Sequence, residues 1–123
     1  MNHVIIGVGS NLPDSRRIVE MCCEVIRSIA ASSRFSSCYE TVPVSTIRQA
    51  NYHNCVGIID TDKSYEELRT IFKAMEVQAG RTKDDKLRGV VALDVDIVKW
   101  NDEVISARDM MQDYMQIGLK QLA

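Results

Sequence analysis

Apolar and polar positions along this chain recur with two periods, and the two periods alternate. Four segments show the alternating or β-branched pattern of strands, at residues 3–8, 33–39, 54–60 and 92–97. Two segments carry apolar side chains three and four positions apart, which predicts amphipathic helices over residues 15–31 and 64–79. A closing helix is predicted over residues 107–122. The predicted order is therefore β-α-β-β-α-β, followed by an extra helix.

This order is typical of the ferredoxin-like fold, which interleaves two split βαβ units. We expect an α+β fold in which residues 1–123 form a single domain, with an antiparallel sheet and both main helices packed on one face. The opposite face is then left for ligands and for the long connections predicted at residues 40–51 and 81–89. Because this fold hosts many functions, the chemistry has to be argued from individual side chains.

Composition excludes several classes of protein. The 123 residues are 46% hydrophobic and 26% charged, and the net charge of −2 lacks the basic excess typical of nucleic-acid binding. No apolar run approaches the roughly 20 residues that a membrane span needs. Residues 1–7 lack the basic start of a signal peptide. We therefore expect a cytoplasmic protein with neither a membrane nor a nucleic-acid partner.

The cysteines and histidines argue against a zinc site. The four cysteines form no CxxC pair; they are Cys22, Cys23, Cys38 and Cys55. In a protein without a secretory signal we expect them to be buried, reduced thiols. The two histidines, His3 and His53, are too few for a multi-histidine metal site.

The strand predicted over residues 92–97 carries two carboxylates on one face. Alternation puts Asp94 and Asp96 opposite Leu93, Val95 and Ile97, with about 7 Å between the two aspartate backbones. Like charges this close shift each other's pKa, and a divalent cation removes the repulsion. Carboxylate oxygens suit Mg²⁺, which usually arrives with substrate phosphates, and such a pair can serve two ions about 3.5–4 Å apart. The alternative is a solvated strand face with two ordinary surface aspartates.

Two further segments are candidates to converge on this pair. The charged loop has a basic balance, which suits a polyphosphate beside a metal ion; its cations are Arg81, Lys83, Lys86 and Arg88 against Asp84 and Asp85. Tyr52 offers a ring for stacking, and Asn54 offers an amide with both donor and acceptor, which suits a flat heterocycle. Each feature has an ordinary alternative. The charged residues can form a solvated loop, Tyr52 can be an edge residue of the core, and Asn54 can be a turn residue at the start of a strand. The residues alone are therefore consistent with a nucleotide-phosphate site and also with these structural alternatives.

Five short motifs follow one another from Gly9 to about Ile105. They are Gly9-Ser10-Asn11-Leu12, Tyr39-Glu40-Thr41-Val42-Pro43, Asn51-Tyr52-His53-Asn54, Glu76-Val77-Gln78-Ala79-Gly80-Arg81 and Leu93-Asp94-Val95-Asp96-Ile97. Any one of them is a weak signal, but together, in this order and spacing, they are specific. In these motifs the chain resembles the 6-hydroxymethyl-7,8-dihydropterin pyrophosphokinases of folate synthesis.

The resemblance implies an enzyme that transfers pyrophosphate from ATP to a hydroxymethylpterin, with Mg²⁺, and releases AMP. It implies that Asp94 and Asp96 hold two Mg²⁺ and form the catalytic centre together with Arg81. The implied nucleotide-binding residues are Glu76, Arg81, Lys83, Arg88 and Ile97. The implied pterin-binding residues are Tyr52, which stacks on the ring, Asn54, which bonds to its edge, and Val44. The implied partners are ATP and the pterin, and we expect a monomer or a homodimer.

Two departures from the family pattern bear on activity. The family has Gly-Pro-Arg-Thr before the aspartate strand, whereas this chain has Gly89-Val90-Val91-Ala92, so that Val91 stands where the family has a phosphate-binding arginine. We hypothesise that Arg88 reaches the phosphates instead. The family also continues with a Pro-His element, an arginine and a second stacking aromatic. In this chain Tyr114 and Trp100 are the candidates for that second ring.

Three functions are therefore open. The first is a shortened but working pterin pyrophosphokinase, which the five motifs favour. The second is a homologue that binds nucleotide or pterin without efficient turnover, which the two departures favour. The third is a ferredoxin-like interaction module that associates through its free sheet face. Mg²⁺-dependent binding of ATP separates the first two from the third, and AMP release separates the first from the second.

Overall fold

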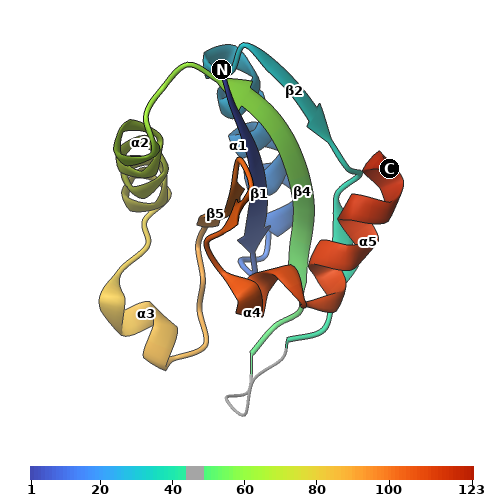
Figure 1. Ribbon diagram of the computed structural model, residues 1–123. Coiled ribbons are helices and arrows are strands. Elements are labelled where there is room, and N and C mark those ends of the chain that lie inside the picture. The colour runs from blue at the N-terminus through green and yellow to red at the C-terminus, as the bar shows by residue number, and fades with distance from the viewer. Residues whose placement is uncertain (44–48) are drawn as a thin grey trace.

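The computed structural model describes residues 1–43 and 49–123, apart from the side chains of residues 83 and 86. Its centre is a six-stranded sheet (Figure 1). The strands are β1 (Asn2–Ser10), β2 (Ser32–Phe35), β3 (Tyr39–Thr41), β4 (Tyr52–Thr61), β5 (Asp94–Trp100) and β6 (Glu103–Val104). The helices are α1 (Ser15–Ile29), α2 (Tyr65–Gln78), α3 (Lys83–Leu87), α4 (Ala107–Met110) and α5 (Asp113–Leu122). Within the described ranges, no helix combines the length and the apolar character that a membrane span requires.

The order of the strands confirms the ferredoxin-like fold. Across the sheet the order is β2-β4-β1-β5-β6, and β3 also pairs with β4. Every pairing is antiparallel, including those of β1 with β4 and with β5. The connection through α1 passes over β4, and the connection through α2 passes over β1. Each helix therefore crosses one intervening strand, as two interleaved βαβ units require.

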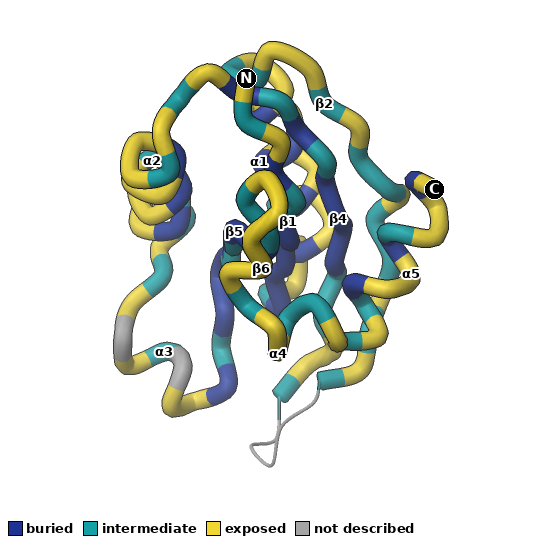
Figure 2. Tube along the Cα trace, viewed as in Figure 1, coloured by how far each residue is buried: buried dark blue, intermediate teal, exposed yellow. Residues whose placement is uncertain are grey.

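The main hydrophobic core lies between the sheet and helices α1 and α2. Val4, Ile6 and Val8, at alternate positions of β1, are each at most 1% exposed. Ile26 of α1 and Phe72 of α2 belong to the same cluster. Figure 1 shows α1 behind the sheet, and Figure 2 shows buried residues along β1, β4 and β5. Burial of each such side chain stabilises the fold by about 1.5–3 kcal/mol. This packed face therefore holds in place the strands that present residues on the opposite face of the sheet.

The ends of α2 follow from its sequence. The Ser64 hydroxyl accepts from the Glu67 N–H at 3.1 Å, and the Glu67 carboxylate accepts from the Ser64 N–H at 3.0 Å. This reciprocal capping box satisfies two N–H groups that have no partner inside the helix. Gly80, with φ 94°, follows the helix in the left-handed conformation that glycine adopts without strain. Both ends of this helix are therefore confirmed within a residue or two.

The single strand predicted over residues 33–39 is wrong, because β2 and β3 are separate. The Ser36 N–H donates to the Val56 carbonyl at 2.8 Å, and the Ser36 hydroxyl accepts from the Val56 N–H at 2.9 Å. A side-chain oxygen thus takes the place of a backbone carbonyl in the ladder with β4, and regular pairing resumes only at Tyr39. Part of the loop predicted over residues 40–51 is consequently the end of β3, and residues 44–48 lie outside the described range.

The charged loop predicted over residues 81–89 contains the short helix α3. The Thr82 hydroxyl accepts from the Asp85 N–H, and the Asp85 carboxylate accepts from the Thr82 N–H, both at 3.3 Å. This is the same reciprocal cap as at the start of α2, and Asp84 and Asp85 favour the N-terminal turn electrostatically. The Thr-x-x-Asp spacing was therefore a readable helix signal.

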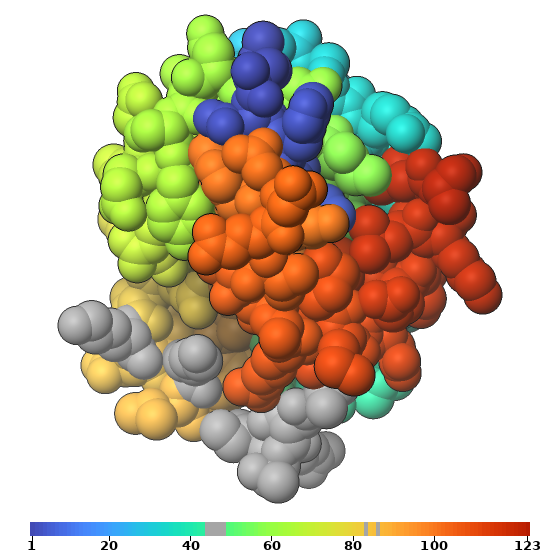
Figure 3. Space-filling view, viewed as in Figure 1, coloured from blue at the N-terminus to red at the C-terminus, as the bar shows by residue number. Residues whose placement is uncertain are grey.

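The closing helix predicted over residues 107–122 is divided into α4 and α5. The helix is interrupted at Gln112, which adopts an extended backbone with ψ 145°. Helix α5 then packs Met115 and Leu122 against Val56 and Val98, on the face of the sheet opposite α1. The prediction that this face is left free is thus wrong for the part beneath α5 (Figure 1). Figure 3 shows that β6 and α4, in orange, lie between α2 and α5 on the surface.

Candidate active site

Asp94 and Asp96 lie on the sheet face opposite α1 and α2, because the apolar residues that alternate with them belong to the main core. In the register of β1 and β5, Gly9 lies beside Asp94 and Gly7 beside Asp96. On the other side of β1, Gly9 pairs with Asn54 of β4. Since neither glycine has a side chain, β1 forms a low floor between the two aspartates and Asn54. We call Gly7 and Gly9 the glycine floor.

Glu76 completes an acidic cluster with the two aspartates. Carboxylate oxygens of Glu76, Asp94 and Asp96 all lie within 4.8 Å of one another, and the described residues contain no other such group of acidic, histidine or cysteine ligands. Glu76 is only 4% exposed, near the end of α2. Its Oε2 accepts from the Val95 N–H at 2.9 Å, which ties α2 to β5 between the two aspartates.

Arg81 lies inside this acidic cluster. Its Nη1 is 2.7 Å from Asp94 Oδ1 and 3.1 Å from Glu76 Oε2, and it donates to the Leu93 carbonyl at 3.2 Å. Lys73 Nζ lies 3.5 Å from Glu76 Oε1. Two cations thus face three carboxylates, so the charge of the third carboxylate has to be offset by a proton or by a further cation.

The two aspartates titrate differently. Burial, the neighbouring Asp94 charge and a hydrogen bond between the two carboxyls raise the pKa of Asp96 to about 8. Burial alone would also raise the pKa of Asp94, but hydrogen bonds from Asp96 and Arg81 hold it below the ordinary value. Without a cation the pair therefore holds one proton at neutral pH, which is how two close carboxylates avoid mutual repulsion.

The raised pKa of Asp96 predicts how the stability of the metal-free protein depends on pH. Between about pH 4 and about pH 8 the folded chain keeps a proton that the unfolded chain has released, so the free energy of unfolding should fall as the pH rises through this window. Asp96→Asn removes the titrating group and should flatten the slope. Urea unfolding with a chelator present, at a series of pH values, measures both profiles. Parallel profiles for the two proteins would contradict the assignment to Asp96.

Asn11, from the first motif, holds the segment that leads into the aspartates. Its Nδ2 donates to the Gly89 carbonyl at 2.8 Å, and its Oδ1 accepts from the Val91 N–H at 2.7 Å. Its own N–H donates to the Val91 carbonyl at 3.0 Å. With 6% of its surface exposed, the side chain makes these bonds inside the protein. The motif thus acts on the site through the backbone of residues 89–91.

Asn54 and Tyr52 lie two positions apart on β4 and therefore share a face. Asn54 is 7% exposed, and its Oδ1 accepts from the hydroxyl of Thr41 on β3. Tyr52 is half-buried, and its hydroxyl donates to Gln49 Oε1 at 2.9 Å. Burial, followed by the charge of Asp94, raises the pKa of Tyr52. The phenol is therefore neutral and lies within electrostatic reach of the acidic cluster.

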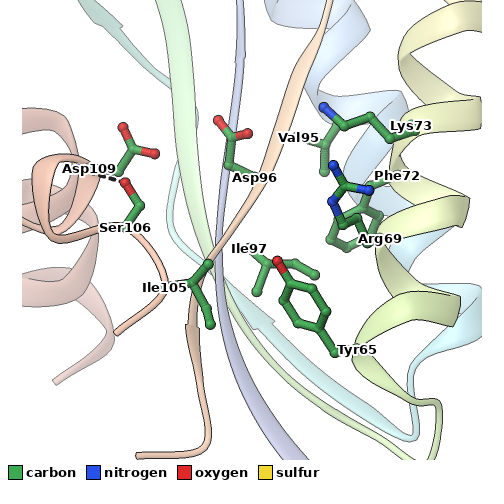
Figure 4. Close-up of a pocket in the computed structure, with 10 residues that line it drawn as sticks. All are labelled: Tyr65, Arg69, Phe72, Lys73, Val95, Asp96, Ile97, Ile105, Ser106 and Asp109. Atoms are coloured by element: carbon green, nitrogen blue, oxygen red, sulfur yellow. Dashed lines mark hydrogen bonds between the residues drawn. The ribbon is translucent and has the colours of Figure 1, made fainter. Parts of the chain in front are cut away.

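A pocket of about 210 Å³ lies on the other side of Asp96, between α2, β5 and the segment that leads into α4 (Figure 4). Ile97 and Ile105 are among its apolar lining residues, and Arg69 and Lys73 line it from α2. Ligand pockets typically measure about 300–1,000 Å³. This pocket is therefore large enough for one end of a nucleotide and not for all of it.

A family comparison relates this arrangement to known proteins. The pattern of the 7,8-dihydro-6-hydroxymethylpterin-pyrophosphokinase (HPPK) family matches residues 5–123, from β1 through α5. The chain belongs to this family. The match includes the glycine floor, the acidic cluster and α5, and the resemblance carried by the five motifs is thereby confirmed.

Bacterial relatives bear the name 2-amino-4-hydroxy-6-hydroxymethyldihydropteridine pyrophosphokinase. The Helicobacter pylori protein is 26% identical over 112 residues, which cover 89% of this chain and 69% of the relative. The Bacillus subtilis protein is 30% identical over 114 residues, which cover 90% and 68%. The Aquifex aeolicus protein is 29% identical over 108 residues, which cover 88% and 67%. This member of the HPPK family thus spans about two-thirds of the length of these relatives.

The remaining residues implicated by the HPPK resemblance lie in different settings. The Arg88 side chain is 70% exposed and pairs with Asp85 of α3, so its described ion pair is not with the acidic cluster. Ile97 lines the pocket beside Asp96. Lys83 begins α3, but its side chain lies outside the described part of the chain, as does Val44 altogether.

Of the two candidate rings, Tyr114 lies on the site face and Trp100 does not. The register between β1 and β5 shifts after Ile97, and Trp100 packs edge-on against Tyr65 of α2, with 5.5 Å between ring centroids. A Cβ atom placed on Gly7 would lie 3.5 Å from Tyr114 Cε2. Since Gly7 pairs with Asp96, the Tyr114 ring lies over the glycine floor next to the aspartates.

The place of Glu76 in the acidic cluster was not predicted, because the family resemblance implied only a nucleotide contact for this residue. A signal was available, because Leu68, Phe72 and Glu76 follow one another at intervals of four and all three are buried. A carboxylate on the apolar stripe of a helix requires a partner inside the protein. Arg81, which closes the same motif, supplies it. The expected nucleotide contact of Glu76 stays a prediction.

Proposed function

We propose that this chain transfers the pyrophosphoryl group of ATP to the hydroxymethyl group of 6-hydroxymethyl-7,8-dihydropterin and releases AMP. The observation that carries the proposal is the position of Asp94 and Asp96 across the glycine floor from Asn54, in a chain of the HPPK family. The names of the bacterial relatives support the same acceptor and the same transferred group.

Mg²⁺ is the cation that we propose for the aspartates. The donors are carboxylate oxygens, which Mg²⁺ prefers, and the proton held between Asp94 and Asp96 is typical of a site that lacks a compensating charge. Held by Asp94 and Asp96, Mg²⁺ would offset the negative charge of the phosphates. Glu76 is 4% exposed and already accepts from the Val95 N–H, so we assign ion binding to the aspartates and a positioning role to Glu76.

ATP is proposed to enter with its adenosine end in the pocket of Figure 4. Ile97 and Ile105 supply apolar surface for a base, and Arg69 and Lys73 supply positive charge along the path to Asp96. The phosphates would then extend along β5 toward Arg81. In that position Arg81 would neutralise phosphate charge, a contribution that phosphoryl-transfer sites depend on.

The pterin is proposed to lie on the opposite side of the aspartates, between Tyr52 and Tyr114. Tyr52 offers a stacking surface. Asn54 bonds to Thr41 and to the Val8 carbonyl, which leaves one N–H and one lone pair of its amide for the ring edge. A ring in this place would direct its hydroxymethyl group toward the phosphates beside Asp96. Because the transfer needs little covalent work from the protein, holding the two substrates in line supplies most of the catalysis.

The second candidate function is binding of the two substrates without efficient turnover. Val91, at the position of the family's phosphate-binding arginine, is 8% exposed and carries no charge. Arg88, the proposed substitute, pairs with Asp85. Loss of one cationic contact to a transferring phosphoryl group costs about 10²–10³ in rate or more, with little effect on the fold. These observations favour a slow enzyme over a fast one.

Two measurements on the same protein test the proposal. The first is AMP release from Mg²⁺–ATP, with and without the hydroxymethyldihydropterin; release that depends on the pterin is the expected result. The second is calorimetric titration of a non-hydrolysable ATP analogue with Mg²⁺. Binding without AMP release would establish the second candidate function. Absence of binding would overturn both, and would leave the interaction module as the function to pursue.

A further inference from the structure

Three of the four cysteines line a second cavity, on the side of the sheet that carries α1. The cavity has a volume of about 280 Å³ and lies between α1, β4 and the connection from β2 to β3. Cys23 comes from α1, Cys38 from the connection and Cys55 from β4. Cys55 belongs to the core under α1, whereas Asn54 before it faces the candidate active site. The proposed pyrophosphoryl transfer therefore makes no use of these thiols.

Cys23 and Cys55 are close enough to react with each other. Their Sγ atoms lie 3.1 Å apart, and both thiols are free. A disulfide has an S–S distance of about 2.0 Å, so the two sulfurs need to approach by about 1 Å. Cys23 lies in the middle of α1 and Cys55 in the middle of β4, so the short distance is set by two regular elements and not by a loop.

We propose that Cys23 and Cys55 form a reversible redox pair, which a hydroperoxide oxidises to an intramolecular disulfide. In the first step the Cys23 thiolate attacks one peroxide oxygen, the O–O bond breaks, and the Cys23 sulfenic acid forms with release of water or an alcohol. In the second step the Cys55 sulfur attacks the sulfenic sulfur and water leaves. Two thiols thus lose two electrons and two protons, and the hydroperoxide accepts them.

The surroundings assign the two roles. The hydrogen bond with Cys55 lowers the pKa of the Cys23 thiol against the effect of burial, and the nearby Arg27 guanidinium lowers it further, while Glu20 and Glu24 oppose this. The same hydrogen bond and burial raise the pKa of Cys55. Cys23 is also the more exposed of the two residues, at 6% against 1%, and it lines the cavity together with Arg27. Since the thiolate is the nucleophile, Cys23 is the residue that attacks the peroxide and Cys55 the one that resolves the sulfenic acid.

The cavity supplies the route for a small oxidant. Cys23 and Cys55 are only 6% and 1% exposed, so a bulky reagent has little access to either sulfur. Both nevertheless line a space far larger than one hydrogen peroxide molecule. Cys22 is the matched internal control, because it is equally buried but does not line the cavity, and burial raises its pKa to about 12.

The test uses the whole chain, reduced and then treated with hydrogen peroxide in slight excess over protein. Remaining thiols are alkylated after denaturation, and intact mass and peptide mass spectrometry follow. We expect the mass of two hydrogen atoms to be lost, a cross-linked pair of peptides that contain Cys23 and Cys55, and reversal by dithiothreitol. The midpoint of thermal unfolding should rise by several degrees on oxidation, because the bond constrains the unfolded chain.

Because Cys22 and Cys23 are neighbours in one peptide, two variants separate them. Cys22→Ala should form the disulfide as the native chain does, and Cys23→Ala should not. Tandem fragmentation of the cross-linked peptide from the native chain gives the same assignment if a variant does not fold. A bond through Cys22, oxidation confined to Cys38, or full alkylation of both Cys23 and Cys55 after peroxide treatment would each overturn the proposal.

Discussion

Asp96→Asn is expected to abolish the Mg²⁺-dependent binding of ATP and to lower kcat/KM for pyrophosphoryl transfer by more than about 100-fold. The substitution keeps the shape of the side chain but removes one of the two aspartate charges that the proposed ion needs. It should not unfold the metal-free protein, because Asp96 is already protonated there at neutral pH. Calorimetry with the non-hydrolysable ATP analogue and an AMP-release assay measure the two effects.

Asp102→Asn is the matched control for this experiment. Both substitutions replace an aspartate by an asparagine, so the formal charge changes equally. Asp102 lies in the exposed turn between β5 and β6, only six positions from Asp96 along the chain. We expect this variant to bind and turn over as the native chain does, since exposed substitutions outside a site usually have small effects. If Asp96→Asn bound the nucleotide as tightly as Asp102→Asn, the aspartate pair would be an ordinary strand surface.

Gly118→Ala is expected to lower the free energy of unfolding by about 1–3 kcal/mol, the usual cost of an overpacked contact. In an exposed helix the same change stabilises by about 1 kcal/mol, so the sign itself is informative. A Cβ atom at Gly118 would overlap the Val56 side chain and lie 2.9 Å from the Tyr39 hydroxyl oxygen. Helix α5 would have to move away from the sheet. Urea denaturation monitored by circular dichroism measures the change.

Lys120→Ala, on the exposed side of the same helix, is the control for the helix propensity of alanine. Its free energy of unfolding should stay within about 0.5 kcal/mol of the native value. A Gly118→Ala variant that is more stable than the native protein would mean that α5 does not pack closely on β4. Because Tyr114 of α5 lies over Gly7, a displaced α5 should also weaken the proposed binding of the pterin.

Local periodicity was enough to predict β1, β4, β5, α1 and α2, and the face on which the aspartates lie. A strand fixes the direction of its side chains residue by residue, so the alternation through Leu93, Asp94 and Val95 placed the pair correctly. Two further features were readable at the same level and were missed. They are the Thr82–Asp85 cap of α3 and the position of Glu76 on the buried stripe of α2.

Other features depend on contacts between distant segments, which local patterns do not encode. The register shift after Ile97 turns Trp100 toward α2, and the residue types near it do not predict this shift. The packing of α5 on the second face depends on Gly118, whose missing side chain matters only because Val56 lies opposite. The bonds of Asn11 to residues 89 and 91 join positions nearly eighty apart in the chain.

The same bonds explain how the site segment keeps its shape with valine at position 91. Asn11 holds the Val91 N–H and carbonyl, and these groups are present whatever side chain the residue carries. The side chain itself is buried. With valine in place of the family's arginine, the backbone that leads to Asp94 therefore keeps its path. The proposed phosphate site has one positive charge fewer.

The place of Arg81 among the carboxylates has a consequence for the order of events in the cell. Because Arg81 is part of the chain, it neutralises Asp94 and Glu76 as soon as the chain folds. Folding of this region therefore does not require a bound metal ion. Loading of the proposed divalent ion would then be an exchange, in which the ion would compete with Arg81 for Asp94 and displace the proton of Asp96. A monovalent ion would carry too little charge to displace Arg81 from Asp94. The proposed site would therefore select ions by charge through Arg81 as well as through its carboxylate ligands.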